Sequence, residues 1–151
     1  MPIRFVPRRL AILLPALTAL TFALPQAQAA PDHNPLVAER WKTRPVVVVV
    51  PHRDDAMLER VRSTLRQAPA REAFIEREMV LYTVVAGEGQ RNEKPMQARQ
   101  TRALLAALKL DAAGPPTFVL VGKDGGIKMT EGADVDLNAV FAEIDRMPMR
   151  R

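Results

Sequence analysis

Five consecutive valines, residues 46–50, constrain the fold of this chain more than any other sequence feature. A β-branched run without a polar interruption is typical of a strand that is buried on both faces. Such strands occupy the centre of sheets that helices cover on both sides. Pro51 ends the run, since proline cannot donate to the hydrogen-bond ladder of a sheet. The sequence therefore predicts an α/β fold with this strand at its centre.

The next segment predicts a helix and then a second strand. Asp54 and Asp55 are placed to cap a helix, because carboxylates accept hydrogen bonds from the unpaired N–H groups at a helix start. Apolar residues at helical spacing continue this helix towards Pro69. An ambiguous segment at residues 71–77 follows, and residues 79–85 form a second, almost continuously apolar strand.

The C-terminal half predicts a helix, two strands and a last helix. A polar loop at residues 87–93 leads into a helix whose first turn suits Pro95. Residues 117–121 read as a third strand, and a tight turn with two glycines at residues 123–126 joins it to a fourth over residues 127–130. Four apolar residues at the spacing of one helical face predict the final helix: Leu137, Val140, Phe141 and Ile144.

The predicted order of elements is therefore β-α-β-α-β-β-α. The first two strands are joined by a helical crossover and should be parallel. The last two are joined by a tight turn and must be antiparallel. The expected fold class is a three-layer α/β/α sandwich around a mixed four-stranded sheet.

The first 29 residues predict a secretory signal peptide. The positive n-region contains Arg4, Arg8 and Arg9. An apolar stretch follows at residues 10–24, and an A-x-A cleavage signal at residues 27–29. Cleavage is expected near Ala29/Ala30. The apolar stretch would be about 23 Å long as a helix, against about 30 Å for the hydrocarbon core, so no stable membrane span is expected after cleavage.

The predicted organisation is a signal peptide at residues 1–29, a lead-in at 30–44 and a folded domain at 45–151, in a periplasmic or secreted protein. The chain carries 22 basic and 17 acidic residues, a net charge of +5. Three of the basic residues and none of the acidic ones lie in the signal, so the mature chain carries about +2. It has no run of Lys and Arg with interleaved aromatic residues, and we expect no nucleic-acid partner.

The sequence contains no cysteine. This excludes disulfides, thiolate-ligated zinc, iron–sulfur clusters and every thiol nucleophile or thiol redox couple in this chain.

The order of elements resembles that of the minimal thioredoxin fold, and so does the segment GPPTFVLV at residues 114–121. In that fold a cis-proline precedes the third strand, and Pro116 would take its place. The alternative is a trans proline that only begins the strand. The catalytic C-x-x-C pair of thioredoxins follows the first strand, where this chain has residues 52–56 and no cysteine. The resemblance implies a thioredoxin-like sandwich without dithiol chemistry.

Three segments resemble the bacterial domain of unknown function family 4174, also called P-DUDES, which is related to domains of vertebrate extracellular-matrix and sushi-repeat proteins. They are WKTRP at residues 41–45, GKDGGIK at 122–128 and IDRMPMR at 144–150. The Met-Pro-Met-Arg ending is the most specific of them. Members are typically exported and thioredoxin-like, without an established activity, so the resemblance implies a fold and a compartment but no catalytic residue.

Two groups of residues are candidates for a functional role. The first is a binding edge at the position of the thioredoxin active site, made of His52, Arg53, Asp54, Asp55, Pro116 and Thr117. The second is the C-terminal segment, which either packs on the core or contacts a partner, made of Met147, Pro148, Met149 and Arg150. The His-x-Asp-Asp spacing is too generic for a metal site, so we expect neither a metal nor a cofactor.

Three functions fit these observations. The preferred one is a non-catalytic exported module that binds a protein or an envelope component, because the predicted fold is intact and its usual nucleophile is absent. The alternative is a cysteine-independent enzyme that uses the Asp, Arg and His groups of the binding edge. The third is a structural or stress-related exported domain without a discrete site.

Overall fold

The computed structural model describes residues 33–148. The predicted signal peptide and cleavage position lie outside these residues, and so do Met149 and Arg150 of the predicted partner contact. The elements, in chain order, are α1 (Pro35–Glu39), β1 (Arg44–Val50), α2 (Ala56–Arg66), α3 (Ala68–Glu76), β2 (Met79–Val85), β3 (Glu88–Arg91), β4 (Lys94–Pro95), α4 (Ala98–Leu108), β5 (Thr117–Val121), β6 (Ile127–Glu131) and α5 (Leu137–Asp145). None of the described helices is long and apolar enough to cross a membrane.

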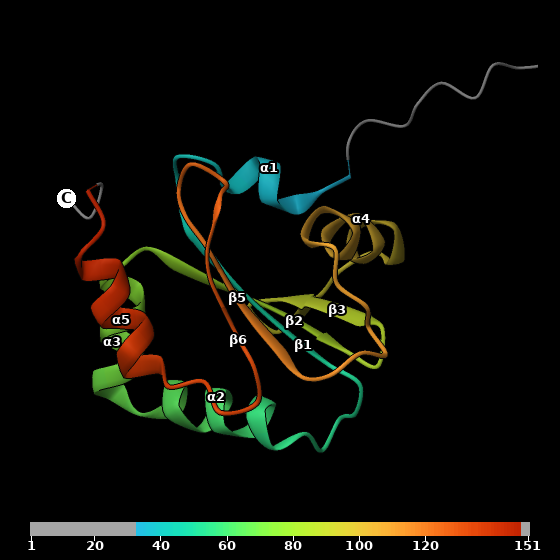
Figure 1. The fold of residues 1–151 in the computed structure, drawn as a ribbon, viewed down its shortest axis with the longest axis horizontal. Helices are drawn as coiled ribbons and strands as arrows, with labels where there is room; N and C mark the ends of the chain where they lie inside the picture. The colour runs from blue at the N-terminus through green and yellow to red at the C-terminus, as the bar shows by residue number, and fades with distance from the viewer. Residues whose placement is uncertain (1–32, 149–151) are drawn as a thin grey trace, which may run out of the picture.

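The strands form one mixed, six-stranded sheet in the order β4-β3-β2-β1-β5-β6 (Figure 1). β1 pairs in parallel with β2 and antiparallel with β5, and β6 pairs antiparallel with β5. The predicted parallel pairing of the first two strands and the antiparallel pairing of the last two are therefore confirmed. The fold is a mixed α/β architecture, as expected.

The prediction of a four-stranded sheet is wrong, because β3 and β4 form a hairpin in place of the predicted polar loop at residues 87–93. Pro95, expected in the first turn of a helix, lies in β4. Only Gly89 of β3 is buried, so this strand has no apolar alternation that the sequence could reveal. The turn residues Asn92 and Glu93 have φ values of 45° and 65°, a conformation usually signalled by Asn-Gly.

The valines of β1 divide the core into two halves. Val46, Val48 and Val50 pack with residues of α2, α3 and α5, whereas Val47 and Val49 pack with residues of α1 and α4. Each of the five is at most 1% exposed. Figure 1 shows the two groups of helices on opposite sides of the sheet. The prediction of a strand buried on both faces is confirmed.

The helix ends agree in part with the sequence patterns. The Asp55 side chain accepts a hydrogen bond from the backbone N–H of Met57 at 2.9 Å, so Asp55, one of the two carboxylates predicted to cap this helix, is the N-cap of α2. In the ambiguous segment, α3 buries Phe74 but leaves Ile75 65% exposed. One face of that helix alone reaches the sheet.

The segment before β5 differs from the thioredoxin-based expectation. No peptide bond within residues 33–148 is cis, so the prediction of a cis bond before Pro116 is wrong. The chain enters β5 with the trans isomer, which is intrinsically favoured by about 0.5–1 kcal/mol. The Thr117 side chain donates to the carbonyl oxygen of Pro115 at 2.9 Å, and Thr117 pairs with Val49 of β1.

Candidate functional site

The predicted binding edge lies at the C-terminal end of β1. Because Val49 pairs with Thr117, the loop after β1 and the start of β5 are at the same end of the sheet. His52, Arg53 and Asp54 are exposed on that loop. The fold therefore brings the two parts of this edge to one region of the surface.

Two charged side chains of this edge have partners within the fold. Asp55 caps α2, and Arg53 forms an ion pair with Glu88 in which both side chains are more than 70% exposed. Exposed pairs of this kind contribute about 0–1 kcal/mol. None of the edge residues lines the cavities described below. The binding edge therefore presents exposed polar side chains that do not converge on a described cavity.

The segments that carry the family resemblance meet at the opposite end of β1. The backbone N–H of Trp41 donates to the carbonyl oxygen of Lys123 at 2.7 Å. A cavity of about 280 Å³ lies there, and its lining includes Arg44, Lys123, Met147 and Pro148. Met147 is half-buried and packs against the core, as the packing alternative for the C-terminal segment expects.

The charged groups of this cavity have partners within the fold. Arg44 is 1% exposed and donates to the carbonyl oxygen of Arg77 at 3.0 Å. Lys123 is paired with Glu78. These contacts fasten the start of β1 and the β5–β6 turn to residues 77 and 78, which follow α3.

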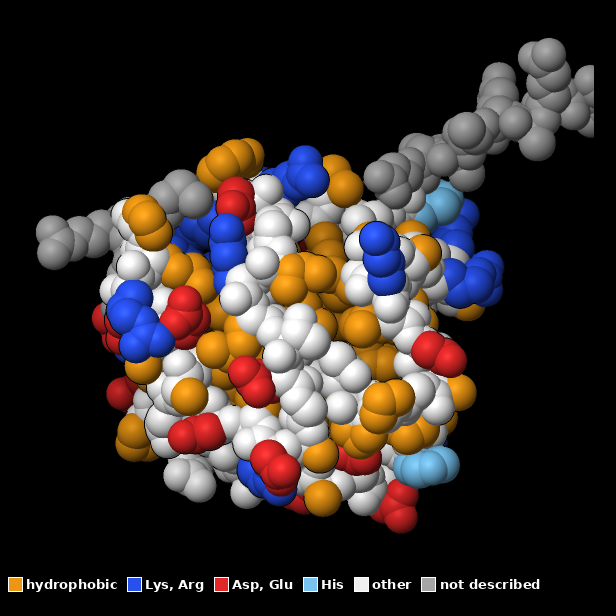
Figure 2. Space-filling view, viewed as in Figure 1, with side chains coloured by type: hydrophobic (Ala, Val, Ile, Leu, Met, Phe, Trp, Pro, Cys, Tyr) orange, Lys and Arg blue, Asp and Glu red, His pale blue; other side chains and the backbone are white. Residues whose placement is uncertain are grey.

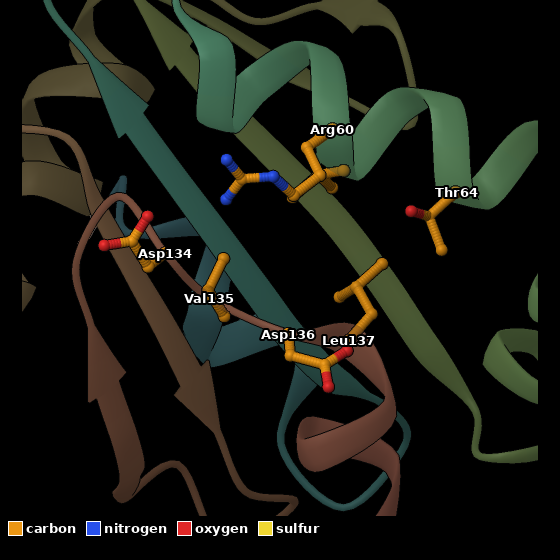
Figure 3. A pocket seen from close by; sticks show the side chains of 7 residues that line it. Arg60, Thr64, Asp134, Val135, Asp136 and Leu137 are labelled. Carbon is orange, nitrogen blue, oxygen red and sulfur yellow. The ribbon is translucent and has the colours of Figure 1, made fainter.

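A second cavity, of about 360 Å³, lies between α2 and the loop before α5 (Figure 3). Figure 3 shows the guanidinium of Arg60 extending from α2 towards the part of the loop that carries Asp134. Arg60 donates to the carbonyl oxygen of Ala133 at 2.7 Å. Asp136 caps α5 by accepting from the backbone N–H of Asn138 at 2.9 Å. Arg60 and Asp136, two polar residues of the cavity lining, thus hold the loop before α5 in place.

Three ionisable groups whose pKa values are shifted lie together between α1, β2 and β3. Glu39 ends α1 and is only 6% exposed. Its carboxylate accepts hydrogen bonds from Tyr82 Oη at 2.7 Å, Arg91 Nε at 2.8 Å and Thr43 Oγ1 at 2.6 Å. These four residues form the Glu39 cluster.

The fold places the members of the Glu39 cluster by sheet register and by a helix cap. Tyr82 of β2 is directly opposite Arg91 of β3, so the two side chains share one face of the sheet. The side chain of Asn34 accepts from the backbone N–H of Leu36 at 3.1 Å and so starts α1. Leu36 packs into the core half beneath α1 and α4, which brings Glu39 over Tyr82.

The cluster holds fixed protonation states at neutral pH. Burial alone would raise the pKa of Glu39, but hydrogen bonds from Arg91, Thr43 and Tyr82 outweigh it, and the pKa lies below its usual value. Burial and the hydrogen bond to Glu39 both raise the pKa of Tyr82. The hydrogen bond to Glu39 also raises the pKa of Arg91. The carboxylate and guanidinium are therefore charged, and the phenol is neutral.

Tyr82 is the sole tyrosine, so absorbance can follow its ionisation directly. We expect no phenolate in the folded protein at about pH 10, where free tyrosine is half ionised. A pKa raised in the folded state means that stability is lost as the pH rises above the unfolded value, so phenolate should appear together with alkaline unfolding in circular dichroism. In Glu39→Gln the titration midpoint should fall. An ordinary midpoint in the folded wild-type protein would contradict this assignment.

A cavity of about 430 Å³ opens beside the Glu39 cluster. Its lining contains two cations, Lys42 and Arg91, one carboxylate, Glu39, and the amide of Gln100. The volume is within the range of about 300–1,000 Å³ that small-ligand pockets occupy. The cavity therefore has the volume of a small-ligand pocket and is lined by polar groups that the fold holds in position.

The arrangement can offer hydrogen bonds and charged groups to a molecule in the cavity. Among residues 33–148, no group of three or more His, Asp or Glu side chains is placed to hold a metal ion.

Sequence reasoning missed three residues of the Glu39 cluster: Glu39, Tyr82 and Arg91. One signal was present: a tyrosine in a strand buried on both faces needs a partner for its hydroxyl.

The surface gives no general electrostatic preference on the face that Figure 2 displays. Basic and acidic side chains are intermixed there, and neither sign forms a broad patch. Hydrophobic side chains are exposed both within that face and along its border.

The fold and the site define a mixed α/β domain with a buried polar cluster beside an open cavity. Residues 35–151 match the family model described as a domain of unknown function, DUF4174. The chain belongs to this family, which confirms the resemblance carried by its three segments. Comparison with curated proteins gives no match, and comparison with solved structures gives none either.

Proposed function

We propose that this chain is an exported, non-catalytic, thioredoxin-like domain that binds a protein or another envelope component. The signal at residues 1–29 supports export. The strand order β2-β1-β5-β6, with its one parallel and two antiparallel pairings, supports a thioredoxin-like layout to which the β3–β4 hairpin is added. The absence of cysteine supports a role other than thiol chemistry.

The cavity beside Glu39 carries the binding role. A buried carboxylate fixes the Arg91 side chain, and donors fixed in advance lose less entropy when a ligand binds. The same groups are poor general acids and bases near neutral pH, because the pKa of Glu39 is lowered and that of Tyr82 is raised. These properties favour binding over catalysis.

Export has a direct measurable consequence. Full-length protein produced in a bacterial host should accumulate outside the cytoplasm, with an intact mass that corresponds to a chain beginning near Ala30. Replacing the A-x-A signal with bulky residues at positions 27 and 29 should block processing. Full-length protein that remains in the cytoplasm would contradict export.

Site-directed photocrosslinking tests the binding role. A photoreactive residue at Ala38, which is exposed and lines the cavity, should form a discrete adduct in the native envelope. The adduct should be lost when Lys42→Ala is added. A photoreactive residue at Glu72, which is exposed on α3, is the matched control and should form none. Adducts from position 54 instead would place the site at the loop edge and overturn the assignment to this cavity.

A further inference from the structure

We propose that the cavity beside Glu39 binds a carboxylate, held by the terminal nitrogens of Arg91 and the ammonium group of Lys42. This inference rests on the proposed binding function and names the chemical class of its ligand. In the Glu39 cluster, Arg91 uses its Nε donor to contact Glu39 and also lines the cavity.

A guanidinium group carries five N–H donors in a rigid plane. In Arg91, Nε donates to Glu39 Oε1 at 2.8 Å and lies 3.2 Å from Tyr82 Oη. The two terminal nitrogens donate no hydrogen bond to any residue in the described part of the chain. The Arg91 side chain is 46% exposed and lines the cavity. One edge of the guanidinium thus anchors it in the protein, and its terminal groups remain available to a ligand.

The contact with Glu39 holds the terminal nitrogens of Arg91 in a fixed position, which favours a ligand that matches their geometry. Glu39 is 93% buried at its side chain, so the carboxylate that holds Arg91 is itself fixed by the surrounding packing. The terminal nitrogens of a guanidinium match the two oxygens of a carboxylate in a bidentate pair. Because Arg91 is held before the ligand arrives, the pair forms without the full loss of side-chain entropy.

The charge of the lining favours a monoanion. Lys42 and Arg91 are opposed by one carboxylate, that of Glu39, which leaves one positive charge uncompensated in the lining. The Lys42 side chain is exposed and forms no ion pair with a described residue. A carboxylate neutralises this excess, whereas a phosphate dianion would place a second negative charge beside Glu39.

Two further features of the lining fit a carboxylate attached to a carbon skeleton. The side-chain oxygen of Gln100 accepts from the backbone N–H of Gln97 at 3.1 Å, so its amide NH2 group is left to donate. Pro35 and Ala38 provide apolar surface at the same cavity. A carboxylate on a small organic acid and one at a peptide C-terminus share this chemistry.

NMR titration of the purified protein tests the assignment, with acetate added at constant ionic strength against chloride. We expect saturable shifts of the Arg91 side-chain signals and of backbone signals around the cavity. Lys42→Ala and Arg91→Lys should each weaken acetate binding at least about tenfold, which corresponds to about 1.4 kcal/mol. Lys94 is an exposed lysine of β4 that does not line the cavity beside Glu39, so Lys94→Ala should bind acetate as the wild type does.

Further titrations separate the sources of the carboxylate. An N-acetylated dipeptide with a free C-terminus that binds more tightly than acetate, while its C-terminal amide does not bind, would identify a peptide carboxylate. Equal binding of acetate and the dipeptide would identify a small acid. Both results support the assignment.

Three results would overturn it. These are shifts without saturation, acetate binding that Lys42→Ala and Arg91→Lys leave unchanged, and saturation by inorganic phosphate at a lower concentration than by acetate. Lys42→Ala keeps the test decisive if Arg91→Lys fails to fold, since Lys42 has no ion pair among the described residues to lose. A crosslink at Ala38 without acetate binding would leave the binding function standing and remove only the carboxylate.

Discussion

Glu39→Ala is expected to lower the free energy of unfolding by about 3 kcal/mol, because it removes a buried carboxylate that accepts several hydrogen bonds. The substitution takes the acceptor from three donors at once: Tyr82 Oη, Arg91 Nε and Thr43 Oγ1. Tyr82 is fully buried in the wild-type protein, and its hydroxyl has the Glu39 carboxylate as its acceptor. Urea unfolding of wild type and variant, followed by circular dichroism, measures the difference.

Two controls isolate the role of this carboxylate. Glu39→Gln keeps the shape and one acceptor oxygen, so its loss should be smaller than that of Glu39→Ala. Glu72→Ala removes an exposed glutamate of α3 and should change stability by less than about 0.5 kcal/mol. If Glu39→Ala cost no more than Glu72→Ala, the Glu39 cluster would not stabilise the fold.

The pH dependence of this loss has a defined sign. The pKa of Glu39 is lower in the folded state than in the unfolded chain. Its ionisation therefore contributes stability above the unfolded value, near pH 4.3, and this contribution is lost as the pH falls through the folded value. The stabilities of wild type and Glu39→Gln should converge in acid.

Gly89→Ala should lower the free energy of unfolding by about 1–3 kcal/mol, the usual range for overpacking a core position. A Cβ at this position would lie 2.2 Å from Thr101 Oγ1 and 3.0 Å from Thr101 Cγ2. Thr101 is 2% exposed in α4, so its side chain has little room to move away. The β3 strand and α4 would have to separate, and chemical unfolding measures the cost.

Gly132→Ala is the matched control, since a Cβ there meets no atom within 4 Å. Its effect should stay within about 0.5 kcal/mol. Adding Thr101→Ala to Gly89→Ala removes the two closest atoms, so the double variant should be more stable than the sum of the single effects implies. Strict additivity would show that the two side chains do not collide.

The strands of the core could be predicted because burial selects apolar side chains. Residues 79–85 and 117–121 were predicted with the bounds that β2 and β5 have. The β3–β4 hairpin could not be predicted in this way, since its strands expose nearly all their side chains. Its strand β3 pairs with β2 through backbone hydrogen bonds, which do not require particular side chains and so cannot be recognised from the sequence.

The candidate site was harder to predict than the fold. Asp55 was correctly predicted as a helix cap, because that contact spans only two residues. Glu39 instead meets Tyr82 and Arg91 across 43 and 52 positions of the chain. Nothing local to Glu39 distinguishes it from an exposed helical glutamate, and only the packing of α1 on the sheet makes it a buried acceptor.

The two-residue strand β4 has a consequence for how the protein behaves at high concentration. It forms one border of the sheet, and it consists of Lys94 and Pro95. An unpaired strand border is a template for other chains, but a very short one that carries lysine and proline is a poor template. Proline has no N–H to offer and lysine resists dehydration, so this border guards against edge-to-edge aggregation.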